Sequence, residues 1–412
     1  MPSICFYFQV HQPFRVKRYR IFDVGSGHDY FSGTEGNLNN KRVLRKVALK
    51  SYLPANATLL ELLTKHPEFK ISFSLSGVVL KQFELYLPEV LYSFKQLVDT
   101  GRVEILSETY YHSLAFLYSK NEFFRQIEMH RQKIKHLFDY EPKVFRNTEL
   151  IYNNDLARYI EEKGYKGILT EGADHILGWR SPDFVYRPQG AKHIGLLLKN
   201  YKLSDDIAFR FSSKWWEEYP LDAAKYASWI SAKNGTSQII NLFMDYETFG
   251  EHQWEDTGIF KFLKSLPGEL LRHPDNHFVT PLEAVERFQP VAELDIPHFI
   301  SWADIERDLS AWLSSPIQKD AIEKVYALEE KVLATGDIRL IEDWRRLQTS
   351  DHFYYMCTKW FADGDVHKYF NPYESPYDAF ISYMNVLRDM YMRVAEHQKI
   401  RANEQSFLVQ SA

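Results

Sequence analysis

Cysteine is scarce in this chain of 412 residues, which contains only Cys5 and Cys357. Two cysteines cannot build the disulfide framework that holds small secreted domains together. No segment approaches the roughly 18 consecutive apolar residues of a membrane span. The first residues contain neither a basic region nor a long apolar run, so we expect no signal peptide. These features predict a cytoplasmic protein with no membrane partner.

An excess of positive charge is also missing. Lys and Arg number 50 and Asp and Glu 55, which gives a formal net charge of −5. Proteins that bind nucleic acid normally carry a basic patch, so we expect no nucleic-acid partner. The chain contains no G-x-G-x-x-G or G-x-x-x-x-G-K-[ST] phosphate loop, no H-E-x-x-H zinc motif and no cysteine pair. We therefore expect neither a metal nor another cofactor.

Aromatic residues, in contrast, make up 16% of the chain. They could fill a large core or stack against sugars, because the C–H faces of pyranose rings pack on aromatic rings. Composition alone leaves both interpretations open. The hydrophobic fraction of 45% and the charged fraction of 25% are typical of a soluble globular protein. The length suits one large catalytic domain with an appendage, or two to three domains.

Short apolar runs that end abruptly on polar residues recur along the first part of the chain. They cover residues 4–10, 70–75, 102–106, 143–145, 167–169, 238–244 and 278–281. Helical stretches lie between them, for example after Asn154 or Asp155, either of which can cap a helix that stops at Gly164. Strands separated by helices pair in parallel, and continuously apolar strands indicate a sheet covered on both faces.

Two folds fit this pattern, an open doubly wound sheet and a closed (β/α) barrel. A doubly wound sheet concentrates its site at one switch point, whereas a barrel draws catalytic residues from the ends of several strands. Polar residues follow nearly every run from position 11 to position 247, which favours the barrel. After about residue 300 the spacing becomes helical, at 321–333, 340–348 and 379–398. We predict a catalytic barrel over 1–290 and a C-terminal helical domain over 291–412 that contributes to the active-site cleft.

Glu149 and Asp245 are the strongest catalytic candidates. Each lies just beyond an apolar run, so a barrel brings both to one rim. Glycoside hydrolysis requires two carboxylates, one beside the anomeric carbon and one as proton donor to the leaving oxygen. Two carboxyl groups at one site also drive their pKa values apart. The alternative interpretation is that both are acids of surface loops.

Further polar side chains follow the same runs and are candidates for substrate binding. They are His11, Gln12, Glu108, His112, Arg146, Asp206, Glu247, His252, Trp302 and Asp304. Each has an ordinary structural alternative. The histidines can be satisfied core residues, and Asp206, which follows the apolar run 194–198, can belong to a turn with an ion pair to Arg210. Trp302 can simply pack.

Five separated motifs occur in a fixed order along the chain. They are His11-Gln12-Pro13, Ser76 to Leu80, Phe145 to Leu150, Met244 to His252 and Ser301 to Asp304. Together they resemble glycoside hydrolase family 57, the α-amylase and 4-α-glucanotransferase family, over essentially the whole chain. The nearest likeness is to its intracellular α-amylase group. This resemblance implies an α/β fold, a distorted TIM-like (β/α)7 barrel followed by a C-terminal α-helical bundle.

The resemblance also implies individual roles. Glu149 matches the family's nucleophile and Asp245 its general acid/base. His11 matches the histidine that contacts the sugar at the cleavage subsite, and Glu247 matches a subsite ligand. Trp302 and Asp304 match the fifth motif. One departure is Lys81, because the second motif often continues with glutamate at that position.

The sequence therefore predicts a retaining α-1,4-glucan hydrolase of the amylase type, with an α-glucan or malto-oligosaccharide as its partner. A 4-α-glucanotransferase with the same acids is the nearest alternative, because a glucan hydroxyl can replace water as acceptor. Two further alternatives stay open at this point. One is a metal-dependent polysaccharide deacetylase, and the other is a glucan-binding protein without activity.

Overall fold

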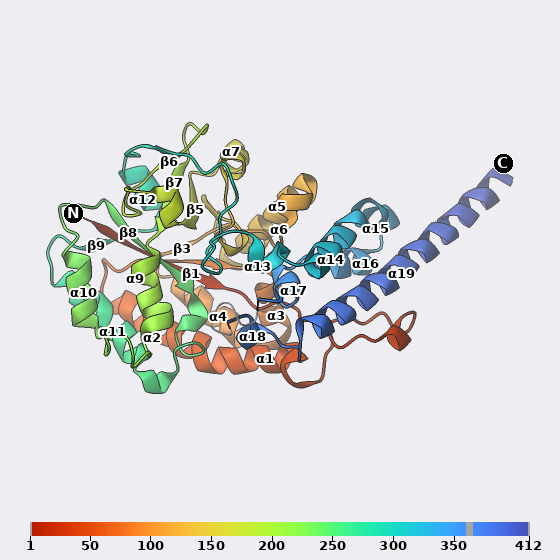
Figure 1. Cartoon of the computed structure of the whole chain (residues 1–412), viewed down its shortest axis with the longest axis horizontal. Helices are drawn as coiled ribbons and strands as arrows, with labels where there is room; N and C mark the ends of the chain where they lie inside the picture. Colours follow the sequence, from red (N-terminus) through yellow and green to blue (C-terminus); the bar gives the residue numbers. More distant parts are fainter. Residues whose placement is uncertain (1, 360–365, 411–412) are drawn as a thin grey trace. The chain divides into compact units, whose positions relative to one another are not determined.

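A computed structural model describes residues 2–359 and 366–410 (Figure 1). Its contacts divide the chain into two compact units, each discontinuous in sequence. The barrel unit comprises Met1–Gln12, Leu44–Tyr110 and Phe124–Asp308, and the helical unit comprises Pro13–Val43, Tyr111–Phe123 and Leu309–Ala412. The boundary near residue 290 and the contribution of the C-terminal domain to a cleft stay predictions. We assigned residues 13–43 and 111–123 to the barrel, but their contacts assign them to the same unit as the C-terminal helices.

Parallel strands form the centre of the barrel unit. They are β1 (Ser3–Val10), β2 (Ile71–Leu75), β3 (Val103–Ile105), β4 (Val144–Arg146), β5 (Gly167–Glu171), β7 (Gly195–Lys199) and β8 (Ile239–Asp245). One sheet has the order β3-β2-β1-β8 and another the order β4-β5-β7. Short strands complete the set, with β9 (His277–Phe278) on β1 and β6 (Arg187–Pro188) on β10 (Glu293–Leu294).

Two seams join these sheets into a ring. Beyond β3, the Ser107 amide donates to the Val144 carbonyl at 2.9 Å, and the Arg146 amide donates to the Ser107 carbonyl at 2.9 Å. On the other side, the Asn200 amide donates to the carbonyl of Asn241 at 2.9 Å, and the Asn241 side chain donates to the carbonyl of Leu198 at 2.9 Å. The described strands therefore close into the predicted distorted (β/α)7 barrel.

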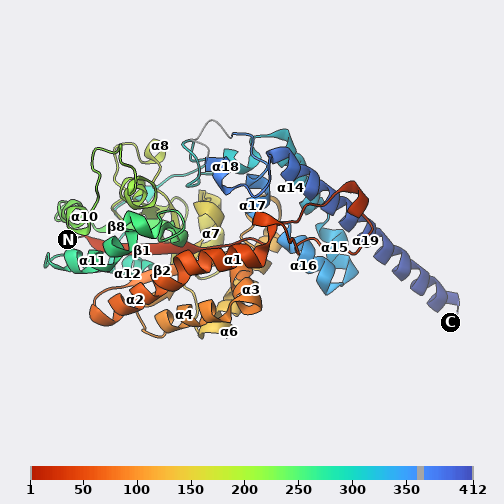
Figure 2. The same ribbon diagram turned by 90° about the horizontal axis from the view of Figure 1, so that it is seen from below.

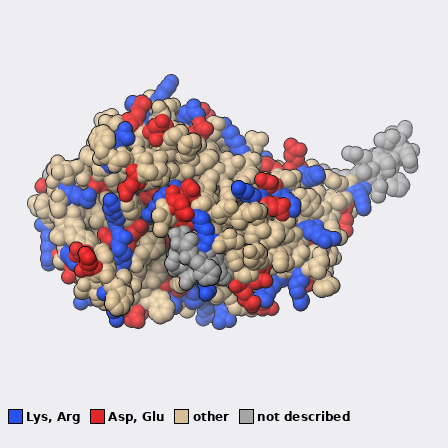
Figure 3. Space-filling model, in the orientation of Figure 1, with Lys and Arg blue, Asp and Glu red and all other residues tan. Residues whose placement is uncertain are grey.

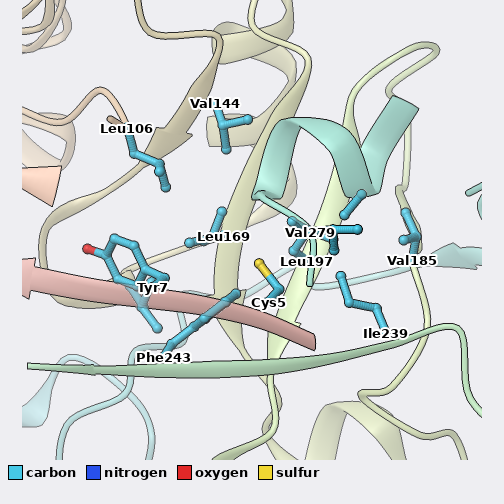
Figure 4. Packing of buried hydrophobic residues seen from close by; sticks show 12 residues of the cluster. Cys5, Tyr7, Leu106, Val144, Leu169, Val185, Leu197, Ile239, Phe243 and Val279 are labelled. Carbon is cyan, nitrogen blue, oxygen red and sulfur yellow. The ribbon is translucent and has the colours of Figure 1, made fainter. Parts of the chain in front are cut away.

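Apolar side chains fill the barrel interior (Figure 4). Cys5 and Tyr7, two residues apart on β1, point to the same side, as alternate strand residues do. The Tyr7 ring meets Phe243 edge to face at a centroid distance of 5.5 Å. Each fully buried side chain of this size contributes about 1.5–3 kcal/mol of burial free energy. The barrel is thus a packed core, which leaves its strand ends as the place for chemistry.

Helices surround the strands. The main ones are α2 (Leu53–Lys65), α3 (Gly77–Tyr86), α4 (Pro88–Val98), α7 (Asn154–Glu162), α9 (Tyr201–Asp205), α10 (Ala223–Ser231), α11 (Ile259–Leu271) and α12 (Pro281–Arg287). Helices α10, α11, α2 and α4 form a row of neighbours outside the sheet (Figures 1 and 2). The side chain of Asn153, rather than Asn154 or Asp155, caps α7 by accepting from the Leu156 amide. The predicted helix is therefore correct and its cap is wrong by one residue.

The helical unit contains seven named C-terminal helices among its described residues. They are α13 (Ser310–Leu313), α14 (Pro316–Ala327), α15 (Glu329–Thr335), α16 (Ile338–Arg346), α17 (Ser350–Tyr354), α18 (Val366–Phe370) and α19 (Pro376–Gln410). The helix expected over 321–333 is interrupted at Leu328, between α14 and α15. Buried Asp389 of α19 accepts hydrogen bonds from the Tyr30 hydroxyl and the Gly25 amide, which anchors the N-terminal segment of this unit.

The remaining α-helices of the described residues are the short α1 (Asn40–Val47), α5 (Ala115–Tyr118) and α8 (Asp174–Leu177) and the long α6 (Lys120–Phe138). Among the described residues, the helices lack the combination of length and apolar character that crossing a membrane requires. Acidic and basic side chains are interspersed over the face shown in Figure 3. This mixture agrees with the small net charge of −5.

Gly250, just after β8, offers a test of local geometry. Its φ is +109°, and a Cβ would collide with the backbone carbonyl oxygen of Lys50. Gly258 also has a positive φ, +86°, but a Cβ there meets open space. We expect Gly250→Ala to lower the free energy of unfolding by about 3 kcal/mol or more and Gly258→Ala by about 1 kcal/mol. Urea unfolding of the two variants measures the difference, and equal losses would contradict this account.

Candidate active site

The barrel gathers most of the predicted site residues at the carboxyl ends of its strands. His11 and Gln12 follow β1, Glu108 follows β3, Arg146 ends β4 and Asp245 ends β8. The others occupy loops and short helical segments of the same unit: Glu149, Asp206, Glu247, His252, Trp302 and Asp304. His112 belongs to the helical unit, where its carbonyl accepts from the Ser350 amide at 2.9 Å.

Glu149 has an unusual backbone conformation. It lies in the turn Thr148–Leu150 directly after β4, with φ 57° and ψ 28°, and the next residue, Leu150, has φ 51°. Left-handed conformations cost residues other than glycine roughly 1–2 kcal/mol each. Two hydrogen bonds hold the turn, one from the Asn147 side chain to the Ile151 carbonyl at 3.0 Å and one from the Trp302 amide to the Glu149 carbonyl at 3.2 Å. Such retained strain is typical of functional sites.

The Trp302 indole is the direct partner of the Glu149 carboxylate. Its Nε1–H donates to Glu149 Oε2 at 2.7 Å. Two cations lie near the same indole ring, the Arg146 guanidinium at 5.2 Å and the Lys199 ammonium at 5.4 Å from its centroid. Both distances fall within the range of cation–π attraction. Glu149 is therefore a partly exposed carboxylate supported by a hydrogen bond and by nearby positive charge.

Arg146 and Glu108 form a buried ion pair beneath this indole. Both are fully buried, and Arg146 Nη1 lies 3.9 Å from Glu108 Oε2. Within the described residues, none of the three guanidinium nitrogens of Arg146 has a hydrogen-bond partner. Burying a cation without hydrogen bonds costs free energy. Because the protein interior has a low dielectric constant, the buried cation also attracts a nearby anion more strongly than it would in water. Contact of these two side chains with substrate stays a prediction. The position of the Arg146 guanidinium at the Trp302 ring, by contrast, is part of the structure.

Asp245 and Glu247 form the second acidic pair. Asp245 is the last residue of β8, opposite Gln9 of β1, and is half-buried. Buried Glu247 accepts hydrogen bonds from the Tyr52 hydroxyl and from Gln12 Nε2, the latter at 3.4 Å. Burial and the neighbouring charge of Asp245 raise the pKa of Glu247 to about 8, and the Tyr52 hydrogen bond opposes this shift. Near neutral pH the pair therefore holds a proton.

Tyr7, in the barrel interior, interacts electrostatically with both Glu108 and Asp245. Burial raises the pKa of its hydroxyl above the usual range, Arg146 opposes the rise, and Glu108 and Asp245 add to it. The pKa of this one interior hydroxyl therefore depends on charged groups at the ends of β3, β4 and β8. Its hydroxyl hydrogen-bonds Ser74 at 2.6 Å, which fixes it in the barrel.

His11 lies at the end of β1 with its ring oriented by Ser76. The distance from Nδ1 to Ser76 Oγ is 2.7 Å, and Ser76 also caps α3. Lys81, the departure from the family motif, occupies α3 and is half-buried. His252 is held near Glu247, because its amide donates to the Glu247 carbonyl at 2.9 Å. Burial lowers the pKa of His252 to about 4, so the ring is neutral.

Asp206 and Asp304 are less central. Asp206 pairs with Arg210 at 2.6 Å, as the ion-pair interpretation expected, and burial raises its pKa against the opposing effect of Arg210. Asp304 lies in the loop after Trp302 with φ 54°. Roles of both in substrate binding stay predictions.

Four charged residues of the site were not among our candidates. They are Glu171, Lys199, Asp205 and Arg307. Glu171 and Lys199 end β5 and β7, so the rule that polar residues follow apolar runs could have found them. Arg307 lies in an irregular loop and gave no such signal. Separately, the described residues contain no group of three or more His, Cys, Asp or Glu side chains arranged to hold a metal ion.

Comparison with known proteins identifies relatives. The model of glycosyl hydrolase family 57 matches residues 5–297. A Methanocaldococcus jannaschii protein, to which an alpha-amylase activity is provisionally assigned, is 43% identical over 406 residues, covering 95% of this chain and 85% of that protein.

Solved structures share the fold at low sequence identity. A branching enzyme from Pyrococcus horikoshii superposes with a TM-score of 0.67 at 15% identity, covering 96% of this chain and 88% of that one. A 4-alpha-glucanotransferase from Thermococcus litoralis gives a TM-score of 0.58 at 20% identity. That match covers 90% of this chain but only 54% of the transferase.

The raised pKa of Glu247 predicts a pH dependence of stability. A carboxyl group whose pKa is higher in the folded state stabilises the protein at low pH, and this contribution is lost as pH rises to about 8. Glu247→Gln mimics the protonated form. We expect the variant to gain stability relative to the natural protein between about pH 5 and pH 8, by an amount on the order of 2 kcal/mol.

Chemical denaturation at several pH values measures this difference. Glu293→Gln, which removes an exposed carboxylate from β10, controls for the general loss of one negative charge. A difference for Glu247→Gln that does not grow with pH would contradict the assignment.

Proposed function

Because the chain belongs to glycosyl hydrolase family 57, we propose that it is a retaining α-1,4-glucan hydrolase of the amylase type. The observation that carries this proposal is the placement of Glu149 after β4 and Asp245 at the end of β8, at the carboxyl ends of one barrel. Its substrates are starch- or glycogen-like glucans, or malto-oligosaccharides. We place it in the cytoplasm, as expected from the sequence.

In the first step, Asp245 donates its proton to the glycosidic oxygen as Glu149 attacks the anomeric carbon. The bond to the leaving oxygen breaks, and a β-glycosyl ester forms on Glu149. For this attack Glu149 must be ionised. The indole N–H of Trp302 and the nearby cations Arg146 and Lys199 favour its charged form.

In the second step, Asp245 acts as a base and removes a proton from water, which attacks the anomeric carbon and releases Glu149. Two inversions give net retention of the α configuration. Burial and the neighbouring charge of Asp245 raise the pKa of Glu247 to about 8, so Glu247 retains a proton beside Asp245 near neutral pH. We propose that this proton limits the negative charge around Asp245, which favours its action as the acid of the first step.

The remaining residues are assigned to substrate binding. We assign His11, Gln12 and Glu247, which follow β1 and β8, to the subsite at which the sugar is cleaved. The substrate-binding residues that we assign to the part of the site around Glu149 are Glu108, Arg146, Trp302 and Asp304. Asp206, His252 and His112 complete the proposed set.

Transglycosylation is the second candidate, favoured by the fold similarity to the Thermococcus litoralis 4-alpha-glucanotransferase. The same two acids perform it when a glucan hydroxyl replaces water in the second step. Which acceptor reacts depends on access of water to the glycosyl ester.

Incubation of the purified protein with maltoheptaose, followed by chromatography of the products, tests the proposal. We expect only shorter sugars, formed at a rate that Glu149→Gln lowers at least about a thousandfold, because the attacking group is lost. Glu293→Gln is the matched control and should retain full activity.

Other product patterns contradict the hydrolase. Sugars both longer and shorter than maltoheptaose indicate a transferase. Loss of activity with a chelator indicates metal-dependent chemistry such as deacetylation. Binding of maltoheptaose without turnover, unchanged by Glu149→Gln, indicates a glucan-binding protein.

A further inference from the structure

The loop 301–308, which supplies Trp302, is closed by its own hydrogen bonds. The Ser301 amide donates to the Arg307 carbonyl at 3.0 Å, and the Ser301 hydroxyl donates to the Asp308 carbonyl at 2.7 Å. The side chain of Arg307 also contacts the start of the loop, because its Nη1–H donates to the Trp302 carbonyl at 2.6 Å. Asp304 and Arg307 have φ values of 54° and 53°. A loop with two left-handed residues needs external contacts to persist.

Arg307 provides those contacts through a buried cluster of four charges. Its Nη1 lies 3.3 Å from Glu171 Oε2, and its Nη2 lies 3.6 Å from Asp205 Oδ2. Lys199 pairs with the same two acids, at 3.7 Å from Glu171 and 3.0 Å from Asp205. Glu171 is fully buried and Arg307 is only 18% exposed. Two acids and two bases balance, which makes burial of the cluster tolerable.

The guanidinium group is suited to this position because it is planar and carries several donors. Nη1 contacts the Trp302 carbonyl and Glu171, while Nη2 faces Asp205. A lysine ammonium is a single point charge and lacks this fork. The contact to the Trp302 carbonyl fixes the backbone of the residue whose indole meets Glu149.

We propose that Arg307 is a positioning residue, which holds Trp302 so that its indole N–H stays on the Glu149 carboxylate. Strand β5, through Glu171, and helix α9, through Asp205, thereby act on Glu149, although Glu149 follows β4. The link runs from Glu171 and Asp205 through Arg307 to Trp302. The inference rests on the proposed function only for its kinetic effect, since the hydrogen bond itself exists without substrate.

The first test is spectroscopic and needs no activity. In an amide- and indole-detected 1H–15N spectrum, Trp302→Phe assigns the indole resonance of Trp302. We expect Arg307→Gln to shift that resonance in the same direction as Glu149→Gln does, because both variants disturb one hydrogen bond. Arg187→Gln, which removes a guanidinium paired with Glu293 in the same unit, should leave it in place.

The second test is kinetic, with maltoheptaose as substrate. We expect Arg307→Gln to lower kcat about tenfold or more while KM changes less than about threefold. Arg307→Lys should retain part of the activity, since it preserves the charge. In the Trp302→Phe background, Arg307→Gln should cost less than about twofold further, because the indole that it positions is gone.

The outcomes separate the two proposals. An unchanged Trp302 resonance in Arg307→Gln overturns the inference, and so do kinetic effects that multiply fully in the double variant. If Arg307→Gln does not fold, Arg307→Lys serves for the spectrum. Absence of turnover in the natural protein rejects the proposed function, while the indole resonance still decides the role of Arg307.

Discussion

Closure of the strand ring is the constraint on which the rest of the structure depends. The hydrogen bonds between Ser107 and β4, and between Asn200 and β8, turn two open parallel sheets into one barrel. Parallel strands point their carboxyl ends the same way, so a closed ring collects side chains from distant parts of the sequence at one face. The closed ring, and not any local motif, places Glu149 and Asp245 at the carboxyl ends of the same set of strands. The apolar interior keeps the ring rigid beneath them.

Charge compensation is the second organising feature of this face. Arg146 is paired with Glu108, while Lys199 and Arg307 balance Glu171 and Asp205. Both groups contact Trp302, which in turn donates to Glu149. At the end of β8, Glu247 is buried beside Asp245, and its raised pKa keeps it protonated near neutral pH. The surroundings thus place positive charge near Glu149 and a protonated carboxyl group beside Asp245, which suits the nucleophile and the acid that we propose.

Much of the fold could be predicted from the sequence because apolar runs and polar strand ends are local patterns. The runs at 4–10, 70–75 and 238–244 became β1, β2 and β8 within a residue or so. Residues 194–198 were noted only as an apolar run, although residues 195–199 form β7. The discontinuous units could not be predicted, since hydrogen bonds such as that from Tyr30 to Asp389 join residues without a shared motif. Arg307 escaped notice for the same reason.

The helical unit draws its chain from three separated segments, and this has a consequence for biosynthesis. Residues 13–43 are synthesised more than 300 residues before buried Asp389, which accepts hydrogen bonds from their Gly25 and Tyr30. Contacts of such long sequence separation form late and slow folding. Residues 13–43 therefore cannot form these contacts before residue 389 has been made. A chain cut before residue 389 therefore lacks the carboxylate to which the Gly25 amide and the Tyr30 hydroxyl donate.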